Sequence, residues 1–195
     1  VTIYGKDYIT DKLGDYYFKI SPLSFYQVNP VQAEALYNYA IEEAKITKND
    51  IVFDLYCGIG TISIFMAKSA KEVYGVEIVE QAIEMAKENE KLNNIDNTKF
   101  IAGDTERVLE DLIENKKVIP DVIIVDPPRK GLDKTSIGNI LKVKPRRVVY
   151  ISCNPASLVR DLKMLEGLYN INSIQPFDLF CFTNHVENVA VLELK

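Results

Sequence analysis

The 195-residue sequence has no tryptophan, a single histidine and only three cysteines. Because Cys57, Cys153 and Cys181 lie far apart, they predict neither a disulfide framework nor a paired-cysteine metal site. With His185 as the only histidine, a Cys/His zinc site is also disfavoured. No apolar run approaches the ~18–20 residues that a membrane span requires. We therefore expect a chain that holds no metal, does not cross a membrane and resides in a reducing cytoplasm.

The first residues lack an initiating methionine, a basic region and an apolar stretch. We therefore expect no signal peptide, and we expect the chain to be cut from a longer protein. A surplus of positive charge is missing as well, since 23 Lys and Arg against 28 Asp and Glu give a net charge of −5. This balance is not that of a nucleic-acid-binding domain.

The composition that is present, 47% hydrophobic and 26% charged, is typical of a globular protein. Residues 2–4, 8–10 and 16–20 are β-rich runs broken by glycine-containing turns. So short a set of strands cannot build a core alone. We predict that residues 1–28 are a β extension, either the end of a preceding domain missing from this chain or a flap, and that residues 29–195 form one domain.

From residue 51 onward, short runs rich in Val and Ile alternate with helical stretches. A helix to about residue 44 precedes them, with Asn29 as its N-cap and Pro30 at its first position. The alternation predicts an α/β fold with a mostly parallel sheet covered on both faces. The last two apolar runs, with only a loop between them, predict an antiparallel pair that closes the sheet. The predicted strands are 51–55, 72–76, 98–101, 121–125, 147–151, 169–180 and 188–194, and the predicted helices after residue 51 are about 60–69, 79–93, 104–116, 133–142 and 155–166.

Uncommon residues follow each of the five predicted parallel strands. Glycines follow Asp54, and then Glu77, Asp104, Asp126 and Cys153 come at or just after the next four strand ends. An open α/β sheet binds ligands beyond the carboxyl ends of its strands. Any one of these Asp residues could simply cap the following helix, but the ordered set of five predicts a binding crevice.

The glycine-rich turn distinguishes between cofactor classes. Gly58 and Gly60 are present, but Ser63 stands where a dinucleotide motif would place its third glycine. The turn suits a nucleoside cofactor without pyrophosphate, with Glu77 accepting hydrogen bonds from the ribose hydroxyls and Asp104 receiving the adenine amino group. This pattern predicts an S-adenosylmethionine pocket, and an NAD enzyme remains the alternative.

The last two strand ends indicate the substrate. The turn Asp126-Pro-Pro-Arg129 is similar to turns that accept exocyclic amines of bases, which predicts a planar heterocycle. Cys153 precedes a helix that Asn154 caps, and a helix N-terminus lowers a thiol pKa. An amine methyltransferase needs no nucleophilic thiol, whereas a carbon methyltransferase acting on uracil or cytosine does. We expect Cys57 and Cys181 to be small buried hydrophobic residues.

Six motifs occur in order along the chain, and together they closely resemble the catalytic domain of RNA uracil-5-methyltransferases. That family makes 5-methyluridine in tRNA and in large-subunit ribosomal RNA. The resemblance covers essentially the whole chain and implies a Rossmann-like S-adenosylmethionine-dependent methyltransferase fold. The motifs are Ser21-Pro-Leu-Ser-Phe-Tyr-Gln-Val-Asn-Pro30, Asp54-Leu-Tyr-Cys-Gly-Ile-Gly-Thr61, Val76-Glu77, Asp126-Pro-Pro-Arg-Lys-Gly131, Ser152-Cys-Asn-Pro155 with Arg160-Asp161, and Phe182-Thr-Asn-His-Val-Glu187.

The resemblance implies a role for particular residues. Cys153 matches the nucleophile and Glu187 the base that removes the C5 proton. Phe25 or Tyr26 would lie near the flipped base, and His185 would be orienting or structural rather than catalytic. The implied cofactor-binding residues are Gln27, Tyr56, Thr61, Glu77, Asp104 and Asp126, beside Gly58 and Gly60 of the turn.

Two departures from the family pattern affect what can be expected. Cys181 stands where the family usually has proline. Full-length members usually add an RNA-binding β-barrel and a central domain, and some hold an iron–sulfur cluster on four cysteines. We expect such missing N-terminal domains to bind most of the RNA, whether tRNA or rRNA, with the protein acting as a monomer. A basic patch is the alternative, formed by Arg129, Lys130, Lys142, Lys144, Arg146 and Arg147.

Two other functions stay open from the sequence alone. One is an amine methyltransferase that acts on adenine or guanine through the Asp126-Pro-Pro turn. The other is an inactive fragment that only binds a nucleotide or RNA. Glu187 precedes the last predicted strand, so it could be no more than a solvated loop residue. The presence of both Cys153 and Glu187, the two residues that a uracil C5 methyltransferase would use, argues against an inactive fragment.

Overall fold

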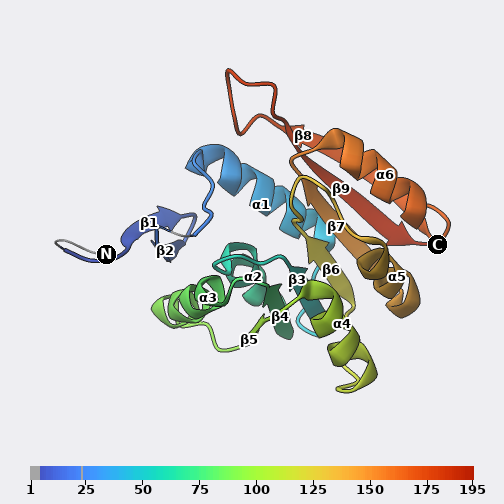
Figure 1. Cartoon of the computed structure of the whole chain (residues 1–195), viewed down its shortest axis with the longest axis horizontal. Helices are drawn as coiled ribbons and strands as arrows, with labels where there is room; N and C mark the ends of the chain where they lie inside the picture. The colour runs from blue at the N-terminus through green and yellow to red at the C-terminus, as the bar shows by residue number, and fades with distance from the viewer. Residues whose placement is uncertain (1–4, 23) are drawn as a thin grey trace.

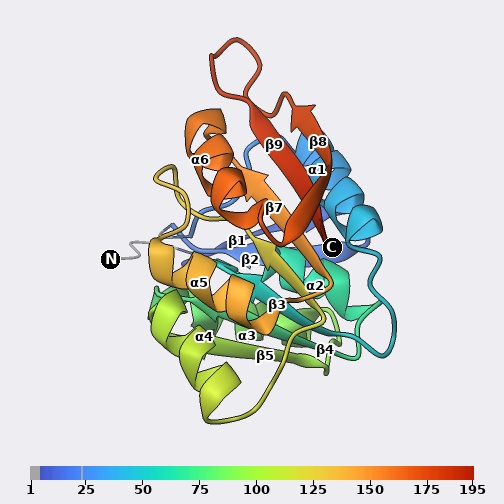
Figure 2. The same cartoon turned by 90° about the vertical axis from the view of Figure 1, so that its right-hand side faces the viewer.

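A seven-stranded, mostly parallel sheet lies between two layers of helices in the computed structural model, which describes residues 5–22 and 24–195 (Figures 1 and 2). The predicted strand at residues 2–4 lies outside the described residues. The strand order is β5-β4-β3-β6-β7-β9-β8, with β1 and β2 forming a separate antiparallel hairpin. The predicted Rossmann-like α/β fold is therefore confirmed.

The observed elements match the predicted ones to within a few residues at most ends. The strands are β1 (Ile9–Leu13), β2 (Tyr16–Ile20), β3 (Ile51–Leu55), β4 (Glu72–Glu77), β5 (Thr98–Ala102), β6 (Val122–Val125), β7 (Arg147–Ser152), β8 (Tyr169–Phe177) and β9 (Glu187–Leu194). The helices are α1 (Pro30–Ala44), α2 (Thr61–Ala67), α3 (Glu80–Leu92), α4 (Thr105–Glu114), α5 (Lys134–Val143) and α6 (Pro155–Leu165).

The sheet buries both faces of its central strands, which are apolar at nearly every position. Val52 faces the core formed with α1, α2 and the hairpin, whereas its neighbour Phe53 faces the core formed with α4, α5 and α6. Side chains alternate between the faces of a strand, so a strand buried on both sides must be apolar throughout. This explains why the Val- and Ile-rich runs predicted the sheet well.

The chain reverses direction across the sheet between β3 and β6. From β3 it winds outward through β4 to β5, and then it returns to β6 and β7 on the other side. Strands β3, β4, β5, β6 and β7 run parallel, so their carboxyl ends meet at one edge. A crevice forms where the winding reverses, and this topological switch point is where the candidate site lies.

The two C-terminal strands pair antiparallel, as predicted, with β9 between β7 and the edge strand β8. Two details of the prediction are wrong. Strand β8 ends at Phe177 rather than at residue 180, and Glu187 is the first residue of β9 rather than part of a loop. Glu187 is only 4% exposed because its strand lies in the interior of the sheet. A buried carboxyl at a strand end is a stronger candidate for chemistry than a solvated one.

The hairpin of β1 and β2 is bound to helix α3 through two asparagine side chains. Asn89 Oδ1 accepts a hydrogen bond from Lys19 N at 2.7 Å, and Asn89 Nδ2 donates to Lys19 O at 3.2 Å. Asn93 makes the same pair of bonds with the backbone of Tyr17. Asn89 Nδ2 also lies 3.2 Å from Ile59 O, within the glycine-rich turn. The extension therefore packs directly against the helix beside that turn, and a boundary at residue 28 stays a prediction.

Candidate active site

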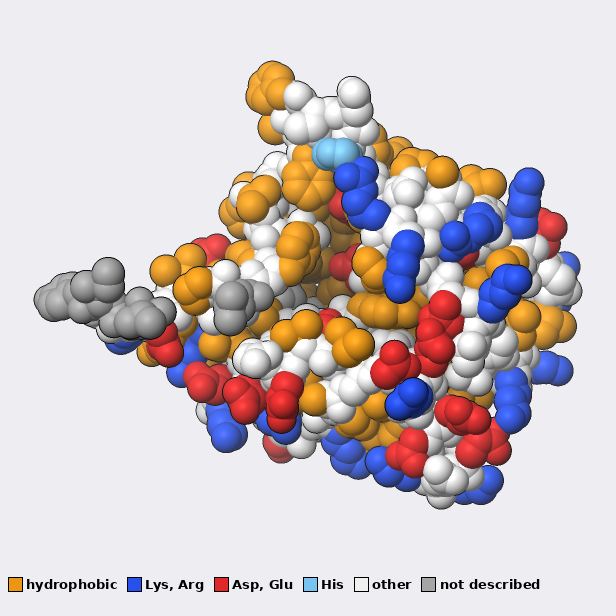
Figure 3. Space-filling model, in the orientation of Figure 1, with side chains coloured by type: hydrophobic (Ala, Val, Ile, Leu, Met, Phe, Trp, Pro, Cys, Tyr) orange, Lys and Arg blue, Asp and Glu red, His pale blue; other side chains and the backbone are white. Residues whose placement is uncertain are grey.

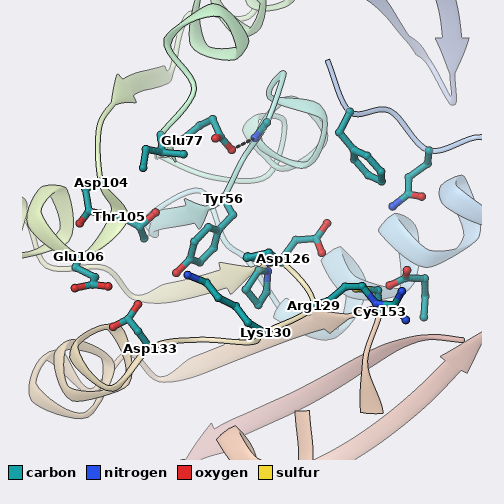
Figure 4. A pocket seen from close by; sticks show the side chains of 17 residues that line it. Tyr56, Glu77, Asp104, Thr105, Glu106, Asp126, Arg129, Lys130, Asp133 and Cys153 are labelled. Carbon is teal, nitrogen blue, oxygen red and sulfur yellow. Dashed lines mark hydrogen bonds between the residues drawn. The ribbon is translucent and has the colours of Figure 1, made fainter. Parts of the chain in front are cut away.

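A cavity of about 580 Å³ opens at the carboxyl edge of the sheet (Figures 3 and 4). This size is in the range typical of sites for small molecules and cofactors. All five predicted strand ends contribute to its wall. The lining residues are Phe25, Gln27, Tyr56, Gly58, Glu77, Ile78, Asp104, Thr105, Glu106, Asp126, Pro127, Pro128, Arg129, Lys130, Asp133, Cys153 and Glu187.

The glycines of the turn after β3 have different roles. Gly58 has a φ of +55°, and a Cβ placed on it would meet no atom within 4 Å, so its backbone is open to a ligand. A Cβ on Gly60 would lie 2.7 Å from the Phe100 ring. Gly60 therefore permits packing and does not line the cavity. Thr61 lines only a smaller adjoining cavity of about 50 Å³.

Glu77 and Asp104 lie at one end of the cavity, as Figure 4 shows. Glu77 Oε2 accepts a hydrogen bond from Gly58 N at 3.2 Å, and Oε1 accepts one from Val79 N at 3.0 Å. Each carboxylate oxygen has a second lone pair for a ligand hydroxyl. Asp104 Oδ1 caps helix α4 by accepting from Arg107 N at 3.3 Å, so both the capping and the cavity-lining interpretations of this residue hold.

Several lining residues at this end of the cavity were not predicted from the sequence. Thr105 and Glu106 follow Asp104, and Asp133 comes from the loop before α5. A hydrogen bond with Asp133 raises the pKa of Glu106 above its usual value. The position directly after a strand-end acid was the available signal for Thr105, whereas the approach of Asp133 depends on how α5 packs beside α4.

Two polar side chains at the cavity wall or just behind it have a buried oxygen without a partner among the described residues. Gln27 is 7% exposed and its Oε1 accepts no hydrogen bond. Asp54 is fully buried, and Ser63 Oγ donates to its Oδ2 at 2.5 Å while Oδ1 has no partner. Burial raises the pKa of Asp54 to about 7. Such orphaned acceptors are uncommon in folded proteins. Gln27 lines the cavity, so its free oxygen indicates a place for a polar ligand, whereas Asp54 is not among the lining residues.

Asp126, Cys153 and Glu187 come together at the other end of the cavity. Burial raises the pKa of Asp126 to about 8, and the nearby Glu187 contributes to this shift. Burial also raises the pKa of Glu187, against the opposing effect of Arg129. A carboxyl with a raised pKa is suited to exchanging a proton near neutral pH.

The expectation that the helix N-terminus lowers the Cys153 pKa is wrong for the ligand-free protein. Burial and the negative charges of Glu187 and Asp126 raise the pKa of the Cys153 thiol, and Arg129 only partly offsets them. The predicted N-cap itself is confirmed, because Asn154 Oδ1 accepts from Ala156 N at 3.1 Å. Among the other cysteines, Cys57 is buried as expected, but Cys181 is exposed.

The loop after β6 is fixed to the helix that follows Cys153. Asn154 Nδ2 donates to Arg129 O at 2.9 Å, and Asp161 Oδ2 accepts from Leu132 N at 2.8 Å. Arg160 Nε donates to Asp161 Oδ1 at 2.8 Å, and its terminal nitrogen donates to Lys130 O at the same distance. These bonds hold the turn from Asp126 to Leu132 in register with the start of α6, and so with Cys153.

The aromatic candidates differ in position. Phe25 lines the main cavity and is 74% exposed, so it is available to a ligand. Tyr26 lines only the smaller cavity, where burial raises the pKa of its hydroxyl to about 12. His185 lies outside the cavity wall, and its Nδ1 is 3.0 Å from a terminal nitrogen of Arg129. This contact agrees with an orienting rather than a catalytic role.

The basic patch considered from the sequence is not a free surface. Arg147 is only 3% exposed and pairs with Glu193 at 3.0 Å. Arg146 pairs with Asp50 at 2.5 Å, and Lys142 pairs with Glu114. The expectation was wrong for Arg147 because β7 lies inside the sheet. Arg129 and Lys130 remain as exposed cations at the cavity.

The described residues contain no group of three or more His, Cys, Asp or Glu side chains placed to hold a metal ion. Among the helices of the described ranges, none is both long and apolar enough to cross a bilayer.

Known proteins are similar to this chain in sequence and in fold. The family model for tRNA (uracil-5-)-methyltransferases matches residues 2–195. A relative from Halalkalibacterium halodurans that is named as an RNA methyltransferase is 54% identical over 194 residues, which are 99% of this chain and 42% of the relative. One from Clostridium tetani is 50% identical over 98% of the chain and 42% of its own length. The chain thus spans less than half the length of these relatives.

Solved structures agree with this result. The tRNA (uracil-54, C5)-methyltransferase of Pyrococcus abyssi in complex with S-adenosyl-L-homocysteine is 37% identical with a TM-score of 0.82, covering 97% of this chain and 45% of that one. An rRNA methylase from Streptococcus thermophilus, 18% identical with a TM-score of 0.62 over 84% of this chain and 96% of its own, shares the fold alone. The match of the family model along nearly the whole chain decides the assignment: the chain belongs to the tRNA (uracil-5-)-methyltransferase family.

Proposed function

We propose that the protein transfers a methyl group from S-adenosylmethionine to C5 of a uridine in structured RNA, through a covalent adduct between Cys153 and C6 of the base. The observation that carries this proposal is that one cavity brings together a thiol and a buried carboxyl, Cys153 and Glu187, at one end and the nucleoside-binding candidates at the other. The RNA is a tRNA or a ribosomal RNA of the cytoplasm.

The residues of the cavity fit the cofactor. The open backbone at Gly58, the acceptors of Glu77 and Asp104, and the orphaned oxygen of Gln27 offer sites for a ribose, an adenine amino group and an ammonium group. Asp126 lines the same cavity and would be available to the cofactor there. When bound, S-adenosylmethionine supplies a methyl group on a positively charged sulfur, which leaves as a neutral thioether.

The uridine must leave its stack to enter the cavity, because C5 and C6 are not accessible in a paired helix. The thiolate of Cys153 then adds to C6, and the electron pair of the C5–C6 double bond moves toward C4 and its oxygen. This makes C5 a nucleophile. Arg129 favours the thiolate, although burial and the two nearby acids oppose it.

C5 would take the methyl group that the bound cofactor supplies, and it would then carry both that methyl group and its own proton. Glu187 then accepts the proton of C5. The electron pair of the C5–H bond restores the C5–C6 double bond, and the Cys153–C6 bond breaks to release the thiolate. A positioned general base typically contributes about 10²–10⁴ in rate.

Support for the cofactor and for RNA also comes from the relatives. The Pyrococcus abyssi enzyme was solved with S-adenosyl-L-homocysteine, and it acts on a tRNA uracil according to its description. An amine methyltransferase is the competing proposal. It would leave Cys153 and Glu187 without a chemical role, although both lie in the cavity.

The direct test is transfer of labelled methyl from S-adenosylmethionine to tRNA and rRNA pools that lack 5-methyluridine, using the full-length protein. We expect 5-methyluridine in one pool and no product with Cys153→Ala. Cys57→Ala is the matched control, because Cys57 is buried outside the main cavity. A methylated exocyclic amine, or full activity without Cys153, would contradict the proposal.

A further inference from the structure

Phe182 is an aromatic side chain that the fold presents to solvent. It is 104% exposed, and its backbone has a φ of +70°. Thr183 N donates to Phe180 O at 3.1 Å, so Phe182 occupies the third position of a four-residue turn. Glycine or asparagine is preferred at that position when φ is positive. Since neither burial nor turn geometry favours phenylalanine there, its ring calls for another explanation.

The turn around Phe182 is ordered by its own hydrogen bonds. Thr183 Oγ1 donates to Phe180 O at 2.7 Å and accepts from His185 N at 3.1 Å. The Phe180 ring meets the His185 ring edge-on at 6.3 Å between centroids. These contacts hold the loop while leaving the Phe182 ring without cover from the described residues. A ring held in advance loses less entropy when it binds a partner.

The loop between β8 and β9 belongs to the substrate end of the cavity. It leads directly into Glu187, and His185 contacts Arg129, which lines the cavity. Figure 1 shows the loop projecting beyond the sheet, and Figure 3 shows it above a hollow that basic side chains border on one side. Arg129 is exposed at this end, whereas Glu77, Asp104 and Glu106 gather at the cofactor end, toward which the Lys130 side chain extends.

A flipped uridine leaves the neighbouring bases of its strand without their stacking partner. Exposed aromatic side chains bind such bases by stacking, and nearby cations bind the phosphates that link them. We propose that Phe182 stacks on the base next to the target uridine, with Arg129 beside the connecting phosphates. This inference rests on the proposed function. It names a contact to RNA on this chain itself, in addition to any domain that precedes it.

The alternative occupant is another part of the full-length protein, since the chain spans less than half of its relatives. The two possible partners, a nucleobase and a protein segment, require different side-chain properties at position 182. A nucleobase requires a flat aromatic surface, so Phe182→Tyr should bind as the parent does and Phe182→Leu should not. A protein neighbour requires an apolar volume, which Leu also supplies, and losing it would lower the melting temperature.

The experiment uses the full-length protein and RNA transcribed with 5-fluorouridine in place of uridine. S-adenosylmethionine is included, so that methyl transfer leaves C5 with both a fluorine and a methyl group. Because fluorine cannot leave as a cation, Glu187 has no proton to remove, and the methylated Cys153 adduct persists on a denaturing gel. At subsaturating RNA, Phe182→Ala should form this adduct about 5- to 100-fold more slowly. Phe182→Tyr should restore the rate, and Phe182→Leu should not.

Three controls separate the possible failures. Ile119→Ala removes another exposed apolar side chain, remote in sequence from this loop, and should leave the rate unchanged. Binding of S-adenosylhomocysteine and the melting temperature should be equal in all the Phe182 variants. If the parent protein forms no adduct, the proposed function itself fails. If the parent forms it and Phe182→Ala does so equally fast, or if Leu rescues as well as Tyr, stacking by Phe182 is overturned while the proposed function stands.

Discussion

Tyr150 donates its hydroxyl to Asp161 Oδ2 at 2.7 Å, and this bond joins strand β7 to helix α6. Both side chains are fully buried. The same oxygen accepts from Leu132 N, so one carboxylate links the strand before Cys153, the helix after it and the loop that follows Asp126. The reactive end of the cavity is thus positioned by a residue that does not line it.

Replacing Asp161 by Asn should therefore weaken both stability and chemistry. The amide offers one acceptor oxygen where the carboxylate offers two, and its NH₂ group would face other donors. We expect a loss of about 1.5–3 kcal/mol in the free energy of unfolding, which urea denaturation measures. Adduct formation by Cys153 should slow while S-adenosylhomocysteine affinity is kept. The control is Asp96→Asn, an exposed acid in the loop before β5, and equal stability of both variants would contradict the positioning role.

Replacing Glu77 by Ala should weaken cofactor binding. The loss of ribose hydrogen bonds to a charged group corresponds to about 1.5–3 kcal/mol, measured by calorimetry with S-adenosylhomocysteine. Because Glu77 also accepts from Gly58 N and Val79 N, Glu77→Gln tests whether charge or turn geometry dominates. The control is Glu80→Gln, an exposed acid three residues later. If Glu77→Ala leaves S-adenosylhomocysteine affinity unchanged, or if NAD binds equally well, the assignment of this end of the cavity to the cofactor is refuted.

Replacing Asp126 by Asn should stabilise the ligand-free protein while impairing methyl transfer. Burial gives Asp126 a pKa of about 8 in the fold against the ordinary 3.8 of an aspartate, so ionisation disfavours folding. Relative to the unfolded chain, the favourable contribution of its protonated form is complete below pH ~4 and is lost progressively as pH rises to about 8. We expect a gain on the order of 1–3 kcal/mol for the Asn variant near pH 8.

The pH dependence provides the check on that prediction. The difference in melting temperature between Asp126→Asn and the parent should grow from pH 5 to pH 8 and then level off. A difference that is constant with pH would mean that Asp126 does not titrate in this window. A destabilised variant at every pH would mean that the ionised carboxylate is satisfied by partners in the fold.

Much of the fold and of the site was predictable from the sequence. The central parallel strands are buried on both faces, so most of their residues are apolar whatever the details of packing. Their carboxyl ends must then meet at one edge, which placed Asp126 and Cys153 in one cavity in advance. Local chemistry likewise predicted the caps at Asn29 and Asn154, since an Asx–Pro pair specifies a helix start by itself.

What could not be predicted depends on contacts between distant segments. The burial of Arg147 and Glu187 follows from the insertion of β9 beside β7, a pairing of residues far apart in sequence. The raised pKa of Cys153 reflects two acids that the fold brings near it and that outweigh the helix N-terminus. Gly60 gave the same sequence signal as Gly58, and only the position of the Phe100 ring shows that its role is packing.

The central claim is that Cys153 acts before methyl transfer and Glu187 after it. The most direct test is Glu187→Gln in the full-length enzyme, incubated with labelled S-adenosylmethionine and its RNA substrate and analysed on a denaturing gel. Without the base, the C5 proton stays and the thiolate cannot leave. The account predicts a protein–RNA species that carries the labelled methyl group and that disappears when Cys153→Ala is added. Normal turnover by Glu187→Gln without a trapped species, or an adduct that persists without Cys153, would contradict it.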